Sequence, residues 1–183
     1  GDEKDKKLIQ YMLKHGHTSP FEMVVFKFRI VAPVLVWWQF VRHRTFSYNA
    51  QSGRYTPFKE NDFYVPTEWR LQSTSNKQGS SGVLDSNLSL GLSEILIRRY
   101  EQGYADYASA LALGVAREQA RLFLHGWGLY YTFYVKMDAH NLIGFLGQRM
   151  ADEAQWEIRQ YALGLWKFFK EALPWTAECF GDK

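Results

Sequence analysis

The sequence is poor in cysteine, in net charge and in long hydrophobic runs, and each shortage excludes a class of protein. Its single cysteine, Cys179, has no partner for an intramolecular disulfide, which favours a reducing compartment. The apolar run over residues 31–36 contains Pro33 and is far shorter than the ~20 residues that a membrane-spanning helix needs. A formal net charge of +3 is too small to indicate a general polyanion-binding surface.

Motifs for zinc and for glycine-rich phosphate loops are also missing. His15, His17, His125 and His140 have no helical pairing with glutamate of the kind that holds zinc, so we expect no metal site. The sequence has no glycine loop of the P-loop or dinucleotide-binding kind. Cys179 follows a helical pattern, and we expect it to be packed and inert at a helix end.

The overall composition fits one globular domain spanning residues 1–183, with 46% hydrophobic and 22% charged residues. The chain opens on Gly1, directly in a helical pattern, so we expect its N-terminus to be incomplete. Residues 72–89 are rich in Ser, Asn, Gly and Gln, which predicts a mobile insertion rather than a domain boundary. Because no signal peptide opens the chain, we expect a cytoplasmic protein, or an organellar matrix protein in a eukaryote.

Apolar periodicity predicts an α+β fold in which an antiparallel or mixed sheet is flanked by long helices. Strands are expected over residues 26–30 and 129–137, with a short edge strand over 63–66. Helices are expected over residues 5–15, 95–111, 117–124, 141–150 and 151–172, with Gly114 and Pro174 as end signals. Pro33 suits the first turn of a further helix, which would end at residues 42–44 and be followed by a loop in which Gly53 is able to take positive φ.

Residues 42–55 follow an aromatic run and draw every basic group from Arg and His. A solvated basic face would use lysines, whereas the planar donor fork of Arg suits phosphate or a flat ring. His43 and Ser52 are close in sequence, but no neighbouring acid completes a nucleophile–base arrangement. We therefore expect Ser52, Gly53 and Arg54 to donate backbone and hydroxyl hydrogen bonds to a phosphate.

Two further arginines, Arg121 and Arg149, occur within otherwise apolar helical faces. A guanidinium in such surroundings needs an anionic or carbonyl partner because it cannot deprotonate. One interpretation is an internal salt bridge with Glu118 or Asp152. The other is a phosphate-bearing ligand shared with the arginines of residues 42–54.

Four segments of the chain, in order, resemble the flavin-dependent thymidylate synthase family. Residues 42–52 match its R-H-R-x7-S signature, and residues 15–22 match its H-G-H-x-[ST]-P-F-E segment. Residues 117–121 resemble its R-E-x-A-R helix, and residues 154–159 its A-Q-W-E-I-R helix. The resemblance covers essentially the whole chain. It implies a fold like that of the thymidylate synthase complementing proteins, without the strand and helix that precede the H-G-H segment in the family.

The same resemblance implies an activity and its ligands. Such a protein is an FAD-dependent homotetramer that converts dUMP to dTMP, with 5,10-methylenetetrahydrofolate as carbon donor and NADPH as reductant. Its sites are shared between subunits, and neither nucleic acid nor a membrane is a partner. Arg149 would polarise the uracil ring and make C5 more nucleophilic, so that no cysteine nucleophile is needed.

By resemblance, each ligand has its own set of residues. The residues expected to bind dUMP are Gln39, Arg42, Gln51, Ser52, Gly53, Arg54, Arg121 and Arg149. Those expected to contact FAD are Ser19, Glu22, Arg42, His43, Arg44, Asn49, Ala50, Asp138, His140 and Gly144.

The chain departs from the family pattern at several FAD-contacting positions. Ala50 stands where the family has Glu, and Gly144 replaces an Asn. Residues 138–140 align with an N-x-R stretch, so that Asp138 and His140 alter the flavin contacts. The arginines expected to bind the nucleotide are all present.

Two other functional classes fit part of the sequence. Arginines beside Trp37, Trp38 and Tyr48 are also typical of a single-stranded nucleic-acid-binding module, although a net charge of only +3 argues against it. The third class is a non-catalytic scaffold that binds flavin or nucleotide.

Overall fold

The computed structural model describes residues 1–60 and 62–180, which form an α+β fold. The chain divides into two compact units. The helical unit comprises Gly1–Lys27, Thr45–Ser47 and the chain from Lys136 onward. The sheet unit comprises Phe28–Arg44 and Tyr48–Val135. The single-domain organisation expected from the chain length stays a prediction.

The helical unit is built around helices α6 (Ala139–Arg149) and α7 (Trp156–Ala172), which pack against each other. Helix α2 (Ser19–Glu22) packs on α6, while α1 (Asp2–Lys14) and α7 both contact α8 (Pro174–Ala177). A short 3-10 helix, η2 (Glu178–Phe180), follows. The core of the unit is apolar, and its fully buried side chains include those of Leu142, Phe145, Ile158 and Phe169.

Most of the helices predicted for this unit are confirmed, with shifted boundaries. Helix α7 begins at Trp156 rather than at residue 151, because residues 151–154 form turns after α6. Asp138 begins α6 by accepting hydrogen bonds from the backbone N–H of Asn141 (2.8 Å) and from its side-chain amide (2.6 Å). Helix α1 has Asp and Glu in its first turn and Lys14 in its last, which complements the helix dipole.

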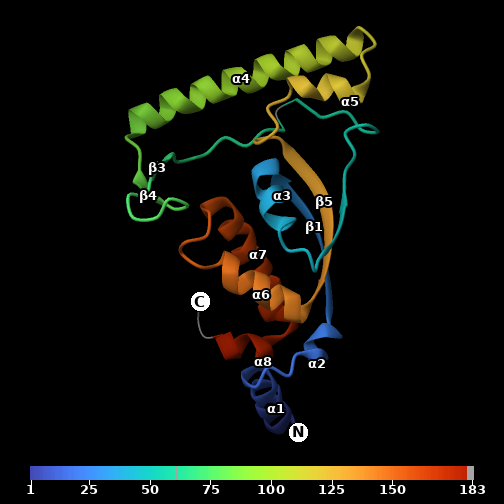
Figure 1. Cartoon of the computed structure of the whole chain (residues 1–183), viewed down its shortest axis with the longest axis vertical. Helices are drawn as coiled ribbons and strands as arrows, with labels where there is room; N and C mark the ends of the chain where they lie inside the picture. Colours follow the sequence, from blue (N-terminus) through green and yellow to red (C-terminus); the bar gives the residue numbers. More distant parts are fainter. Residues whose placement is uncertain (61, 181–183) are drawn as a thin grey trace. The chain divides into compact units, whose positions relative to one another are not determined.

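A three-stranded sheet forms the frame of the sheet unit (Figure 1). Its strands follow the order β1 (Val25–Pro33), β5 (Tyr130–Asp138) and β2 (Ser47–Ala50). Both β1 and β5 were predicted, and burial alternates along them as expected for strands with one covered face. In β5 the buried residues are Phe133, Val135 and Met137.

Strand β2 corrects the prediction of a loop after residue 44. Its exposed and half-buried residues alternate, with Ser47 and Asn49 exposed and Tyr48 and Ala50 half-buried. The backbone N–H of Gln51 continues the pairing by donating to the carbonyl of Thr132 on β5 (2.9 Å). A partner strand distant in sequence therefore makes this polar segment extended.

Helix α3 (Val34–Phe40) confirms the prediction of a helix after Pro33, but it ends at Phe40 rather than at residues 42–44, which follow it in a turn. Pro33 itself is extended and occupies the N-cap position, one residue before the first turn in which it was expected. The ring of Trp37 makes edge contacts with Phe133 (4.7 Å between centroids) and Tyr48 (5.4 Å). These contacts hold α3 against β5 and β2, so the direction in which the chain leaves α3 is fixed.

Part of the predicted 72–89 insertion forms regular structure. Strands β3 (Arg70–Gln72) and β4 (Ser80–Val83) pair as an antiparallel hairpin, and the side-chain amide of Gln72 donates to the carbonyl of Gly79 (3.0 Å). Helix α4 already begins at Ser86, where Asp85 caps it. The mobility of the segment stays a prediction. The expected edge strand over 63–66 is reduced to one bridge between Phe63 and Leu129.

The long helix α4 (Ser86–Ala112) ends where Gly114 predicted. Gly114 has a φ of 83° and donates to the carbonyl of Leu111 (3.0 Å), while Val115 donates to that of Ala110 (3.0 Å). This pair of bonds is the Schellman motif, which satisfies the last carbonyls of a helix. None of the helices within residues 1–60 and 62–180 is long and apolar enough to cross a membrane.

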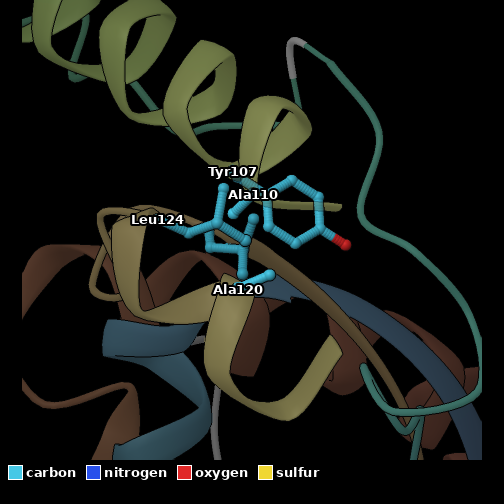
Figure 2. Packing of buried hydrophobic residues seen from close by; sticks show 5 residues of the cluster. Tyr107, Ala110, Ala120 and Leu124 are labelled. Atoms are coloured by element: carbon cyan, nitrogen blue, oxygen red, sulfur yellow. The ribbon is translucent and has the colours of Figure 1, made fainter. Parts of the chain in front are cut away.

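After the Schellman turn the chain forms α5 (Arg117–Ala120) and a 3-10 helix, η1 (Arg121–Phe123). Both pack against α4 beside the end of that helix (Figure 1). Figure 2 shows the buried contact, in which Tyr107 and Ala110 of α4 meet Ala120 and Leu124. Ala110 and Ala120 permit a close approach of α4 and α5, so α5 packs tightly against α4.

Candidate functional site

The predicted site residues fall into two groups, one in each unit. The group in the sheet unit comprises Gln39, Arg42, His43, Arg44, Asn49, Ala50, Gln51, Ser52, Gly53, Arg54 and Arg121. The group in the helical unit comprises Ser19, Glu22, Asp138, His140, Gly144 and Arg149.

The arginine-rich turn after α3 is closed by the hydroxyl of Tyr48. This hydroxyl donates to the backbone carbonyl of Phe40 and lies 3.2 Å from the carbonyl oxygen of His43. The N–H of His43 also donates to the carbonyl of Phe40 (2.9 Å). Burial raises the pKa of Tyr48 above its ordinary value, so this hydroxyl keeps its proton.

The turn presents two cations, because the side chains of Arg42 and Arg44 are exposed. Neither guanidinium has an ion-pair or hydrogen-bond partner among residues 1–60 and 62–180. A fixed backbone with two uncompensated guanidinium groups is suited to binding an anion.

Residues 51–55, which we call the 51–55 loop, form a compact turn after β2. The carbonyl of Ser52 accepts hydrogen bonds from the N–H groups of Tyr55 and Thr56 (3.1 Å each), and its Oγ accepts from the N–H of Arg54 (3.3 Å). No hydrogen bond within the described part of the chain uses the N–H of Ser52 or of Gly53. These two N–H groups and the Ser52 hydroxyl proton can therefore be donated to a ligand.

Gly53 is required in this loop for a reason that the sequence did not reveal. The sequence left positive φ open to Gly53, but Gly53 does not adopt that conformation. Instead, a Cβ at this position would lie 2.6 Å from the ring of Phe58. Phe58 is held in turn by its N–H, which donates to the hydroxyl of Tyr107 on α4 (3.3 Å).

Helix α5 binds the 51–55 loop through two adjacent side chains. Nη1 of Arg117 donates to the carbonyl of Tyr55 (2.7 Å) and, at 3.4 Å, to that of Arg54. The carboxylate of Glu118 lies 3.5 Å from Nε of Arg54. The sequence interpretation assigned no role to Arg117, whose only signal was its place in the R-E-x-A-R motif.

Arg121 lies in a different environment from the one predicted. Arg121 is exposed rather than embedded in an apolar face. The apolar residue next to it in η1, Leu122, is itself 82% exposed, so it forms no buried face around the guanidinium. Nε of Arg121 donates to the backbone carbonyl of Glu118 (3.2 Å), and the carboxylate of that residue pairs with Arg54 instead. The sequence predicted either an anionic or a carbonyl partner for this guanidinium, and the structure shows a carbonyl.

In the helical unit, Arg149 is the last residue of α6 and is half-buried. Burial lowers the pKa of its guanidinium below the ordinary value, although arginine stays protonated. Asp152 was considered as an ion-pair partner of Arg149. In the structure its Oδ1 lies 2.6 Å from Nη2 of Arg159.

The other residues predicted in this unit lie on α2, on α6 or at the N-cap of α6. Ser19 and Glu22 are exposed on α2, where Glu22 accepts a hydrogen bond from the hydroxyl of Thr18 (3.4 Å). The carboxylate of Asp138 is occupied as the cap of α6. His140 is half-buried, and Gly144 has open space where a side chain would point. Their flavin contacts stay predictions.

Cys179 is exposed, so the prediction that it is packed is wrong. Its position in the short η2 helix at the end of the described chain leaves its Sγ with a 3.6 Å contact to the carbonyl of Trp175. Partial burial, followed by the charge of Glu178, raises the pKa of the thiol, which disfavours the thiolate. Within residues 1–60 and 62–180, no three His, Cys, Asp or Glu side chains group as metal ligands would.

Curated relatives are similar over nearly the whole chain. A flavin-dependent thymidylate synthase of Thermus thermophilus is 50% identical over 95% of this chain, which spans 63% of that relative's length. The protein of the same name from Thermosipho africanus is 43% identical, with 97% of this chain and 77% of the relative covered.

Solved structures are also similar. The crystal structure of a UMP/dUMP methylase, PolB from Streptomyces cacaoi, bound with 5-Br dUMP, has a TM-score of 0.88 at 28% identity. The match covers 98% of this chain and 80% of that one. Residues 1–175 match the family described as thymidylate synthase complementing protein, and the chain belongs to that family.

Proposed function

We propose that the protein is a flavin-dependent thymidylate synthase that converts dUMP to dTMP. Its carbon donor is 5,10-methylenetetrahydrofolate and its reductant is NADPH, with FAD as cofactor. The names of the curated relatives support this activity, and the neighbour solved with 5-Br dUMP supports the nucleotide. The chain spans 63% of the length of the Thermus relative.

The observation that carries the proposal is the 51–55 loop. Its unbonded N–H groups at Ser52 and Gly53, the Ser52 hydroxyl and the cation of Arg54 are the donors that a phosphate monoester requires. Ser52 already accepts two backbone hydrogen bonds through its carbonyl, so its place is fixed before any ligand arrives. We assign this loop to the phosphate and sugar of dUMP, together with Gln39, Arg42 and Arg121.

In this proposal Arg149 activates the uracil. A cation beside N3 and its neighbouring carbonyl stabilises negative charge on the ring, which increases the nucleophilicity of C5. Because burial weakens solvent screening around Arg149, its charge acts more strongly there than on the surface. The raised pKa of the exposed Cys179 is consistent with a reaction that uses no cysteine nucleophile.

The residues present fit FAD in part. The exposed and uncompensated Arg42 and Arg44 suit its pyrophosphate. Ala50 offers no side-chain contact, and the carboxylate of Asp138 is engaged by Asn141. We assign Ser19, Glu22, His43 and Asn49 to the remaining contacts. When bound, FAD supplies the redox chemistry that the side chains lack.

The test combines spectroscopy with turnover. Purified protein is expected to carry a bound yellow flavin, to form dTMP from dUMP and to release tritium from 5-tritiated dUMP. Arg149→Ala is expected to lose dTMP formation while it retains flavin. Salt-sensitive oligonucleotide binding without flavin would instead indicate the nucleic-acid-binding module, and flavin without tritium release would indicate the non-catalytic scaffold.

We propose further that the enzyme is a homotetramer whose sites are shared between subunits. Gln39 and Arg42 can then serve a different site from the one that the 51–55 loop of the same chain serves. Light scattering at working concentration is expected to give the mass of four chains. A monomer with full activity would exclude the shared site.

A further inference from the structure

The second half of the 51–55 loop is exposed, whereas Gln51 and Ser52 are half-buried and Gly53 is buried. Tyr55 is 79% exposed, and the side chain of Arg54 is exposed as well. The first residue is tied to β5, because the N–H of Gln51 donates to the carbonyl of Thr132 (2.9 Å). The hydrogen bonds that follow are local and link Ser52 to the N–H groups of Arg54, Tyr55 and Thr56. Exposed chain with only local bonds opens at little free-energy cost, so the part of the loop at Arg54 and Tyr55 needs support from outside the turn to stay preorganised.

Arg117 provides that support to the last part of the loop. Its Nη1 lies 2.7 Å from the carbonyl oxygen of Tyr55 and 3.4 Å from that of Arg54. One cation therefore binds two successive peptide groups, through hydrogen bonds that are stronger than neutral ones because the donor is charged.

The backbone that carries Arg117 is held in place by packing. Arg117 is the first residue of α5, whose Ala120 is fully buried against α4 in the cluster shown in Figure 2. The next residue, Glu118, holds the guanidinium of Arg54 at 3.5 Å. Helix α5 therefore contacts both the backbone of Arg54, through Arg117, and its side chain, through Glu118.

We infer that Arg117 is a positioning residue, which shapes the 51–55 loop for the phosphate of dUMP without touching the nucleotide. The inference rests on the proposed function, because it takes the loop to bind that phosphate. If this is so, loss of Arg117 weakens binding of the phosphate group and leaves binding of the nucleoside unchanged.

The experiment compares dUMP with deoxyuridine, which lacks the phosphate. Calorimetric titration of Arg117→Met is expected to show about tenfold weaker binding of dUMP and unchanged binding of deoxyuridine. Arg117→Lys, which keeps a charged donor on a different side chain, is expected to lose only about threefold. At saturating dUMP the kcat of both variants stays near that of the wild type, while KM for dUMP rises.

The matched control is Arg98→Met, at an exposed arginine of α4 that has no partner within the described residues. This variant is expected to bind both ligands as the wild type does. A general loss of folded protein would lower the binding of dUMP and of deoxyuridine together, and thermal unfolding would reveal it. If Arg117→Met does not fold, Arg117→Lys carries the same comparison.

The outcomes separate this inference from the proposed function. If the wild type prefers dUMP over deoxyuridine and the Arg117 variants keep that preference, the role of Arg117 is wrong and the proposed function stands. If the wild type has no preference for dUMP, the assignment of the loop to phosphate is wrong, and the inference fails with it.

Discussion

The hydroxyl of Tyr48 on β2 donates a hydrogen bond to the backbone carbonyl of Phe40, the last residue of α3. The last carbonyls of a helix have no donor within the helix, so a side chain from a neighbouring strand caps α3. The same hydroxyl reaches the carbonyl of His43 at 3.2 Å. One phenol thereby fixes both ends of the turn that presents Arg42.

Tyr48→Phe is expected to loosen this turn while it keeps the ring contact with Trp37. Removal of the hydroxyl leaves the carbonyls of Phe40 and His43 with one donor fewer, and the free energy of unfolding should fall by about 1–2 kcal/mol. Binding of dUMP and FAD should weaken as well, because Arg42 and Arg44 lose their fixed backbone. Urea denaturation and ligand titration measure the two effects.

The control for this substitution is Tyr55→Phe. The side chain of Tyr55 is 79% exposed, and the contact that the structure shows for this residue with Arg117 uses its backbone carbonyl. Its stability should change by less than about 0.5 kcal/mol. Equal effects of the two substitutions would mean that the Tyr48 hydroxyl does not stabilise the turn.

Alkaline pH should destabilise the protein through its buried phenols. Burial raises the pKa of both Tyr48 and Tyr100 above the ordinary value of 10.0. The folded state then holds these protons more tightly than the unfolded state, so their contribution is complete below pH 10 and is lost as the pH rises through the folded pKa. Urea midpoints measured above pH 10 should fall less steeply in Tyr48→Phe than in the wild type.

Two glycines of α4 should respond to alanine with opposite signs. A Cβ at Gly103 would lie 2.7 Å from the carbonyl oxygen of Phe123, whereas Gly91 has nothing within 4 Å. Gly91→Ala should therefore stabilise by about 0.5–1 kcal/mol through helix propensity alone. Gly103→Ala should destabilise by about 1–3 kcal/mol, because the backbone of η1 has to move. Chemical denaturation of the two variants checks the packing of α4 on η1.

The elements predicted correctly are those with a long periodic pattern. Phe133, Val135 and Met137 alternate along β5, and Tyr100 and Tyr107 share the buried face of α4, so a local window contains the signal. Strand β2 and the β3–β4 hairpin are short and polar. They exist because of bonds such as that from Gln51 to Thr132, which no local window can show.

For the candidate site, the sequence identified residues more readily than the reasons for them. The spacing of arginines and the family motifs indicated residues 42–54 as a binding segment. Arg117 received no role because its partners are carbonyls, one of them 62 residues earlier in the chain. Gly53 was chosen for its conformational freedom, yet the structure requires it because the Phe58 ring approaches so closely.

Cys179→Ser should leave dTMP formation unchanged. The thiol is exposed, but its pKa is raised by partial burial and by Glu178, so little of it is thiolate at neutral pH. Alkylation by iodoacetamide is expected to be slow and to leave the activity intact. If alkylation inactivated the wild type and the untreated serine variant were inactive as well, a mechanism without a cysteine nucleophile would be contradicted.

Arg149→Lys should impair turnover more than binding. The ammonium keeps a charge near the uracil but lacks the planar fork that spans N3 and a carbonyl, so kcat should fall by about 10–100-fold while KM for dUMP changes little. The burial that lowers the pKa of Arg149 would also lower that of a lysine there. The remaining activity of the variant should therefore be present below the lysine pKa and decline as the pH rises through it, whereas arginine stays charged. Arg159→Lys, at an arginine paired with Asp152, is the matched control and should show no new pH dependence. An Arg149→Lys enzyme with normal kcat and a raised KM would assign Arg149 to binding alone.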